Sequence, residues 1–150
     1  MIRIVVDSPS DYREEELKEK NIELVLITIT IGEQSFLDGI ELERDRFYEM
    51  LIESGDFPKT SQPSPQAFLD IFLDAKAKGD EVICILLSSE LSGTCQSAVL
   101  ASNMADYDHI HIVDSLSATH VIRILAEYAC KKRGEGACAE EIAASLEALK

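Results

Sequence analysis

The sequence lacks several features that would place it in a specialised class of protein. It has no tryptophan, only four prolines and seven glycines in 150 residues, and no apolar run near the length of a membrane span. A spanning helix needs about 20 consecutive apolar residues, and the first strand meets Asp7 too early for a signal peptide. With 46% hydrophobic residues, the composition is typical of one globular domain, which we predict over residues 1–150.

Basic residues are scarce. Fourteen lysines and arginines face 28 aspartates and glutamates, which gives a formal net charge of −14. A field of that sign repels phosphate backbones and anionic membrane surfaces. Nucleic acid is therefore excluded as a favoured partner, and no membrane span is expected.

The four cysteines, Cys84, Cys95, Cys130 and Cys138, contain no CxxC pair and no histidine at metal-ligand spacing. Cys84 lies within an apolar run, where a thiol behaves as a small hydrophobe. The even number leaves two disulfides possible, but no other feature indicates secretion. We predict reduced cysteines and a cytoplasmic protein.

Strand-like and helix-like segments alternate along the chain. β-branched and apolar runs predict strands at 2–6, 23–31, 36–37, 82–87 and 109–113, with a hairpin turn at 32–35 and a loop at 57–65. Helical spacing predicts helices at 11–20, 42–52, 65–79, 94–104, 118–132 and 139–149, and Ser64 followed by Pro65 is a good start for the third. Strands that are apolar on both faces indicate an α/β fold with a mostly parallel sheet between two helical layers.

Hydroxyl side chains gather where the predicted strands end. Asp7-Ser8, Ser88-Ser89 and Asp114-Ser115 each follow a strand, and Thr60-Ser61 lies in the predicted loop. Ligands of open parallel sheets bind at the carboxyl ends of the strands. Hydroxyls without lysine or arginine suit a polar head group held by hydrogen bonds better than a phosphate. The alternative is that these residues only cap the helices that follow.

Other chemistries have weaker support. The chain has neither GxGxxG nor a Walker lysine motif, so we expect no nucleotide cofactor. Ser92, Asp114 and His120 could form a hydrolase triad, but Ser92-Gly93 is not a GxSxG elbow. Asp7 and Asp114 could hold Mg²⁺, although turn formation explains both better. His109 and His111 share one strand face without a third ligand nearby in the sequence, so we expect no metal.

Five segments carry a resemblance to a known family. They are Val5-Val6-Asp7-Ser8, Leu37-Asp38-Gly39-Ile40, Thr60-Ser61-Gln62-Pro63-Ser64-Pro65, Leu87-Ser88-Ser89-Glu90-Leu91-Ser92-Gly93-Thr94 and Val113-Asp114-Ser115. They occur in the order seen in DegV-family proteins, and the third and fourth are specific. The whole chain resembles the N-terminal lobe of that family.

The resemblance implies a bacterial fatty-acid-binding protein that is not an enzyme. Members hold one acyl chain in an apolar tunnel between two lobes, and some present it to a separate kinase. The residues that match the carboxylate contacts are Thr60 and Ser92, and we expect Ser61, Ser89 and Ser115 at the rim. Family members are about twice as long, so the C-terminal lobe, which supplies an arginine and a histidine, is expected to be absent.

Two other functions remain open from the sequence. One is an interaction module that has lost the ligand, and the other is a serine hydrolase with Ser92 as nucleophile. A lobe that normally closes over an acyl chain would leave an apolar wall exposed, so self-association is also expected.

Overall fold

The computed structural model describes residues 1–150, apart from the side chain of Arg44. Its strands are β1 (Ile2–Asp7), β2 (Ile22–Val25), β3 (Thr28–Ile31), β4 (Gln34–Leu37), β5 (Lys59–Ser61), β6 (Glu81–Leu86) and β7 (Ile110–Asp114). Its helices are the short 3₁₀ turn η1 (Ser8–Ser10) and α1 (Glu14–Lys20), α2 (Arg44–Ser54), α3 (Pro65–Lys78), α4 (Thr94–Ala105), α5 (His120–Gly134) and α6 (Ala139–Leu149). Among the described helices, none is both long and apolar enough to cross a membrane.

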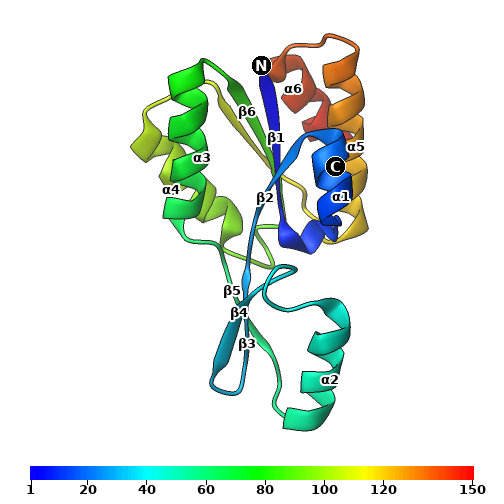
Figure 1. Ribbon diagram of the computed structural model, residues 1–150. Coiled ribbons are helices and arrows are strands. Elements are labelled where there is room, and N and C mark those ends of the chain that lie inside the picture. The colour runs from blue at the N-terminus through cyan, green and yellow to red at the C-terminus, as the bar shows by residue number, and fades with distance from the viewer.

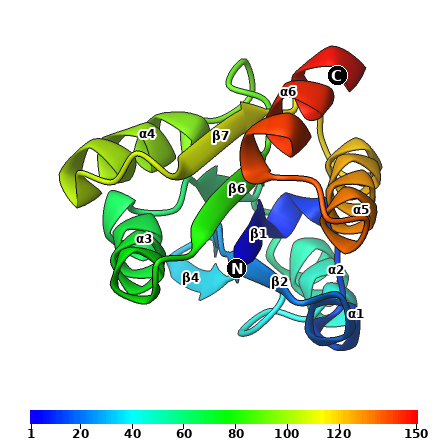
Figure 2. The ribbon, with the colours of Figure 1, turned by 90° about the horizontal axis from the view of Figure 1, so that it is seen from above.

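A four-stranded parallel sheet, in the order β2-β1-β6-β7, forms the centre of the molecule. Helices α3 and α4 cover one face, and α1, α5 and α6 cover the other (Figure 2). The predicted three-layer α/β architecture is confirmed. Parallel strands need such crossovers, which place helices on both faces and bury the sheet between them.

The strands β1 and β6 contribute buried side chains to the core on both faces of the sheet. Along β1, Ile4 and Val6 pack toward α5 and α6, whereas Val5 packs toward α3 and α4. All three side chains are fully buried. Successive side chains of a strand point to opposite faces, so an unbroken apolar run is what a sheet covered on both sides requires.

A second sheet lies beyond the carboxyl ends of the parallel strands. It is antiparallel, in the order β4-β3-β5, and α2 packs beside it (Figure 1). The hairpin between β3 and β4 turns at Gly32, whose φ of +60° favours glycine. The edge where ligands of parallel sheets usually bind therefore faces this smaller sheet.

Three predictions about elements were wrong. The segment 23–31 is two strands in different sheets, because the Ile27 amide donates to the Ser8 hydroxyl between them. The predicted loop at 57–65 contains β5, an exposed edge strand without an apolar pattern. The helix predicted from Asp11 begins only at Glu14, since Asp11 adopts a left-handed φ of 61° that ends the preceding turn.

The start of α3 gives a direct test of the cap inferred from the sequence. The Ser64 hydroxyl accepts a hydrogen bond from the Ala67 amide at 3.3 Å. We expect Ser64→Ala to lower the free energy of unfolding by about 1 kcal/mol, measured by urea denaturation. Ser145→Ala, in the interior of α6, where the hydroxyl donates only to the Glu141 carbonyl one turn earlier, is the control and should be neutral or slightly stabilising, because alanine is the better helix former. A Ser64→Ala variant as stable as the wild type would contradict the cap.

Candidate functional site

A pocket of about 450 Å³ brings together the two residues that the family resemblance matches to one ligand. Thr60 and Ser61 come from β5 of the small sheet, and Ser92 comes from the segment between β6 and α4. Thr60 and Ser92 lie 32 positions apart in the sequence yet line the same cavity. The fold therefore places three hydroxyl side chains around one space at the carboxyl edge of the parallel sheet.

The hydroxyls of this pocket differ in their bonding. Those of Thr60 and Ser61 make no hydrogen bond to any residue that the structure describes, so both are available to a ligand. The Ser92 hydroxyl lies 2.9 Å from that of Thr94 and accepts a hydrogen bond from the Thr94 amide. Its oxygen thus supports the start of α4, while its proton can point to Thr94 or to a ligand.

The remaining wall of the pocket is apolar apart from Gln62. Ile27, Leu87 and Leu91 line it, together with Gly93. The Leu91 side chain is 69% exposed, at the outer edge next to Ser92. Sequence reasoning singled out none of these as site residues, although Gln62, Leu87, Leu91 and Gly93 all lie within the two segments that carry the family resemblance. A few hydroxyls within an apolar surround suit an amphipathic ligand.

Ser89 and Ser115 lie outside the lining of this pocket. The Ser115 hydroxyl is buried and bonds to the backbone of Ser117, donating to its carbonyl and accepting from its amide. Ser89 is exposed, and its amide donates to Asp114 Oδ1. Both residues shape the turns at the ends of β6 and β7, and their place at a ligand rim stays a prediction.

Asp7 is the most unusual charged residue near the site. It is fully buried at the end of β1, and its Oδ2 accepts a hydrogen bond from the Leu87 amide at 2.9 Å. Its Oδ1 has no hydrogen-bond partner among the described residues. Burial raises the pKa of Asp7 from 3.8 to about 6, although the bond from Leu87 works in the opposite direction. Asp7 therefore fixes the start of the segment that carries Ser92.

Residues of the two alternative sites, the magnesium site and the hydrolase triad, make hydrogen bonds within turns instead. Asp114 Oδ1 accepts hydrogen bonds from the amides of Ser89 and Leu116, and Asp7 holds Leu87. Within the described part of the chain, no group of three or more metal-ligating side chains comes together. The hydrogen-bond partner of the Ser92 hydroxyl is Thr94, not a histidine. All four cysteines are free thiols in the structure.

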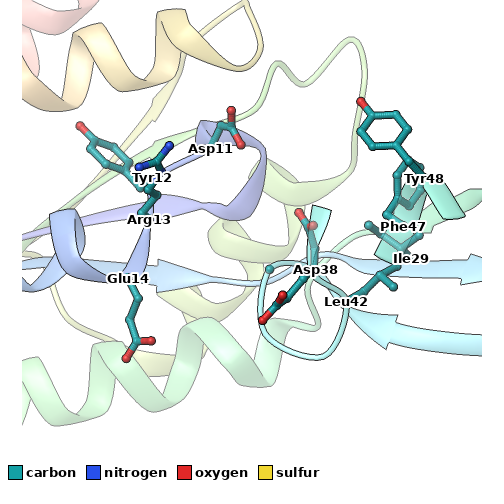
Figure 3. Close-up of a pocket in the computed structure, with 11 residues that line it drawn as sticks. Asp11, Tyr12, Arg13, Glu14, Ile29, Asp38, Leu42, Phe47 and Tyr48 are labelled. Atoms are coloured by element: carbon teal, nitrogen blue, oxygen red, sulfur yellow. The ribbon is translucent and has the colours of Figure 1, made fainter. Parts of the chain in front are cut away.

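A larger pocket of about 680 Å³ lies between the start of α1 and the start of α2. Figure 3 shows Asp11, Tyr12 and Arg13 on one side, Phe47 and Tyr48 on the other, and Asp38 between them. Four acidic residues line it, namely Asp11, Glu14, Asp38 and Glu43, against the single cation of Arg13. An anionic head group would be repelled there, so the smaller hydroxyl-lined pocket is the better site for a carboxylate.

Comparison with known proteins places the whole chain in one family. A family model described as "Uncharacterised protein, DegV family" matches residues 1–150. A DegV domain-containing protein from Caldanaerobacter subterraneus subsp. tengcongensis is 40% identical over 145 residues, which cover 97% of this chain and 51% of that protein. The chain spans about half the length of the curated relatives it matches.

Two solved structures show the same fold. One is described as fatty acid binding of a DegV family protein from Thermus thermophilus, with a TM-score of 0.90 and 29% identity over 99% of this chain and 52% of that one. The other is the Fatty Acid Kinase (Fak) B3 protein of Streptococcus pneumoniae loaded with linoleic acid. Its TM-score is 0.83, with 29% identity over 99% of this chain and 53% of that one.

Proposed function

Because the chain belongs to the DegV family, we propose that residues 1–150 provide the head-group half of a fatty-acid-binding site. The acyl carboxylate is bound by the hydroxyls of Thr60 and Ser92, with Ser61 beside them. Solved relatives of the same fold bind fatty acids, which supports this ligand class. The observation that carries the proposal is the convergence on one pocket of Thr60, from β5 of the small sheet, and Ser92, from the segment that follows β6 of the parallel sheet.

The chemistry of the pocket fits a carboxylate better than other anions. Hydroxyl protons donate charge-assisted hydrogen bonds to carboxylate oxygens, and these are about twice as strong as bonds between neutral groups. Ser92 also lies directly before Gly93, the N-cap of α4, and the N-terminus of that helix carries partial positive charge. A phosphate, with its greater charge, would need the basic side chains that this pocket lacks among its lining residues. Ile27, Leu87 and Leu91 then contact the first methylene groups of the chain.

The proposal predicts discrimination by the head group rather than by the tail. After delipidation, the chain should bind stearic acid about tenfold or more tightly than methyl stearate, because the ester cannot accept charge-assisted bonds. Displacement of a fluorescent fatty acid measures both affinities. Mass spectrometry of an organic extract of the purified protein should also find fatty acids. Equal affinity for acid and ester, or no binding of the acid, would refute the proposed function.

We propose further that the protein carries fatty acids and does not convert them. A relative of the same fold is named as a B3 protein of fatty acid kinase, which supports a kinase as the partner that receives the acyl chain. A carrier of this kind would work in the cytoplasm. Leu116, between β7 and α5, and Val121 and Ile124 on α5 are exposed apolar residues that support self-association. Light scattering should find more than a monomer if these side chains are covered.

A further inference from the structure

At Gly93 the structure leaves no room for a Cβ atom, although the backbone conformation there does not require glycine. Its φ of −78° and ψ of 9° are accessible to any L-residue. A Cβ built at this position, however, would lie 2.1 Å from Oε1 and 2.6 Å from Cδ of Gln62. Real side chains do not approach so closely. The Gln62 amide therefore occupies the space that a side chain at position 93 would take.

The Gln62 side chain is also held at its other atom. Its Nε2 donates a hydrogen bond to the hydroxyl of Ser97 at 3.2 Å. Ser97 is only 3% exposed and lies in the first turn of α4, where its amide donates to the Gly93 carbonyl. The glutamine amide thus lies across the first turn of α4, with Oε1, Cδ and Nε2 all against Gly93 and with Nε2 also bonded to Ser97.

This contact joins the two segments that carry the pocket hydroxyls. Gln62 stands two residues after Thr60, and Gly93 stands directly after Ser92. The strand β5 belongs to the small antiparallel sheet, whereas Ser92 follows a strand of the parallel sheet. Thr60 and Ser92 therefore depend on contacts between the two segments for their separation, and the Gln62 amide makes such a contact beside the pocket.

We propose that Gln62 is a positioning residue that sets the spacing of Thr60 and Ser92 by packing on Gly93 and bonding to Ser97. We call this pair of contacts, Gln62 on Gly93 and Gln62 with Ser97, the lock. The inference rests on the proposed function, because the effect expected from losing the lock is weaker carboxylate binding. Two hydroxyls that must bond to the same carboxylate tolerate little change in their separation. The glycine keeps the lock in place, because any larger residue at 93 displaces the amide.

The test is a double-mutant cycle on the full 150-residue chain. Gln62→Ala removes the amide, and Gly93→Ala displaces it, since the far end of a glutamine can swing away without unfolding the protein. Each variant should bind stearic acid about tenfold more weakly and lose most of its preference over methyl stearate. Because both changes destroy the same contact, the double variant should be no weaker than either single one.

Two matched controls separate the lock from general effects of substitution. Gly134→Ala adds a methyl group where an ideal Cβ meets nothing within 4 Å in the described structure. Gln66→Ala removes another glutamine, whose amide bonds only to Asp70 on the exposed face of α3. Both controls should keep the affinity and the preference for the acid. Additive losses in the double variant, or wild-type affinity in Gln62→Ala, would overturn the proposal.

A measurement on the lipid-free protein tests whether Gln62 connects the two segments, independently of ligand binding. In ¹H–¹⁵N spectra of the lipid-free chain, Gln62→Ala and Gly93→Ala should shift the same amides, those of residues 60–62 and 92–97. Shifts confined to each variant's own segment would overturn the lock. If the wild-type chain bound no fatty acid, the proposed function would fail, and the spectra alone would still decide whether Gln62 ties the two segments together.

Discussion

Removal of both pocket hydroxyls, with Thr60→Val and Ser92→Ala in one chain, is expected to lower the affinity for fatty acid by about 1,000-fold. Each hydroxyl donates a charge-assisted bond worth roughly 1.5–3 kcal/mol once the bound acyl chain shields the exposed site from water. Each single variant should therefore lose about 10- to 100-fold. Apolar burial of the acyl chain is unchanged, so binding weakens and does not vanish. Titration with a fluorescent fatty acid measures all three variants.

Thermal melts of the same variants separate ligand binding from a structural role. Thr60→Val removes a hydroxyl that bonds to no described residue, so the melting temperature should stay within about 2 °C of the wild type. Ser92→Ala also removes the acceptor for the Thr94 amide and should lower stability by about 0.5–1.5 kcal/mol. Ser102→Ala, on α4 and outside the pocket lining, is the control and should keep the affinity. Lower melting temperatures with unchanged affinity would assign both hydroxyls to structure alone.

Much of the central sheet could be predicted because its signal is local. The runs 2–6 and 82–87 are apolar on both faces, and only a sheet covered by two helical layers buries such strands completely. The start of α3 was equally local, since Ser64 and Pro65 have the chemistry of a cap and a first helical residue. Where the residues themselves determine the structure, the prediction held.

The boundary between the two sheets could not be predicted in this way. Leu26 and Ile27 continue an apolar, β-branched run, so their composition favours an unbroken strand. The break depends on partners far away in the sequence, because the Ile27 amide donates to Ser8 and its carbonyl accepts from Asp38. Edge strand β5 could not be predicted for a related reason, because all three of its residues are exposed and give no periodic apolar pattern.

The residues of the candidate site could be predicted only in part. The rule that ligands bind at the ends of parallel strands pointed to Ser88 and Ser89 and grouped Thr60 and Ser61 with them. The specific pair Thr60 and Ser92 was matched to the carboxylate only through the family resemblance, because Thr60 lies in the other sheet and Ser92 stands several residues after β6. Gln62 was quoted in the same segment without a role. Its role requires Gly93 as a neighbour, and only the folded chain brings the two together.

Asp7 was interpreted from the sequence as a turn residue or a magnesium ligand, and its burial predicts a measurable pH dependence of stability. Relative to the wild type, Asp7→Asn should gain about 2 kcal/mol in free energy of unfolding between pH 4 and pH 7.5, measured by urea denaturation at each pH. The asparagine keeps the shape and can still accept the bond from the Leu87 amide. A constant difference between the two proteins is allowed, because the test is its change with pH.

The sign follows from the direction of the pKa shift. The pKa of Asp7 is about 6 in the folded protein against an ordinary value of 3.8, so the folded state binds the proton more tightly. Stability from this group is present below pH 3.8 and is lost as the pH rises to about 6, by about 3 kcal/mol in total at 1.36 kcal/mol for each pH unit. Most of that loss falls between pH 4 and pH 7.5, and asparagine does not suffer it.

The surroundings of Asp7 and a second aspartate make the test specific. The titratable neighbours that face Asp7 are the thiols of Cys84 and Cys95, and burial raises the pKa of both, that of Cys95 to about 12, so neither ionises in this range. At Asp114, burial works to raise the pKa, but the hydrogen bonds from Ser89 and Leu116 prevail and lower it. Asp114→Asn should therefore show the opposite trend and lose stability relative to the wild type as the pH rises. A pH-independent difference for Asp7→Asn would show that Asp7 keeps an ordinary pKa and that its buried Oδ1 has a partner. A gain of stability with pH in both variants would show that the trend is not specific to Asp7.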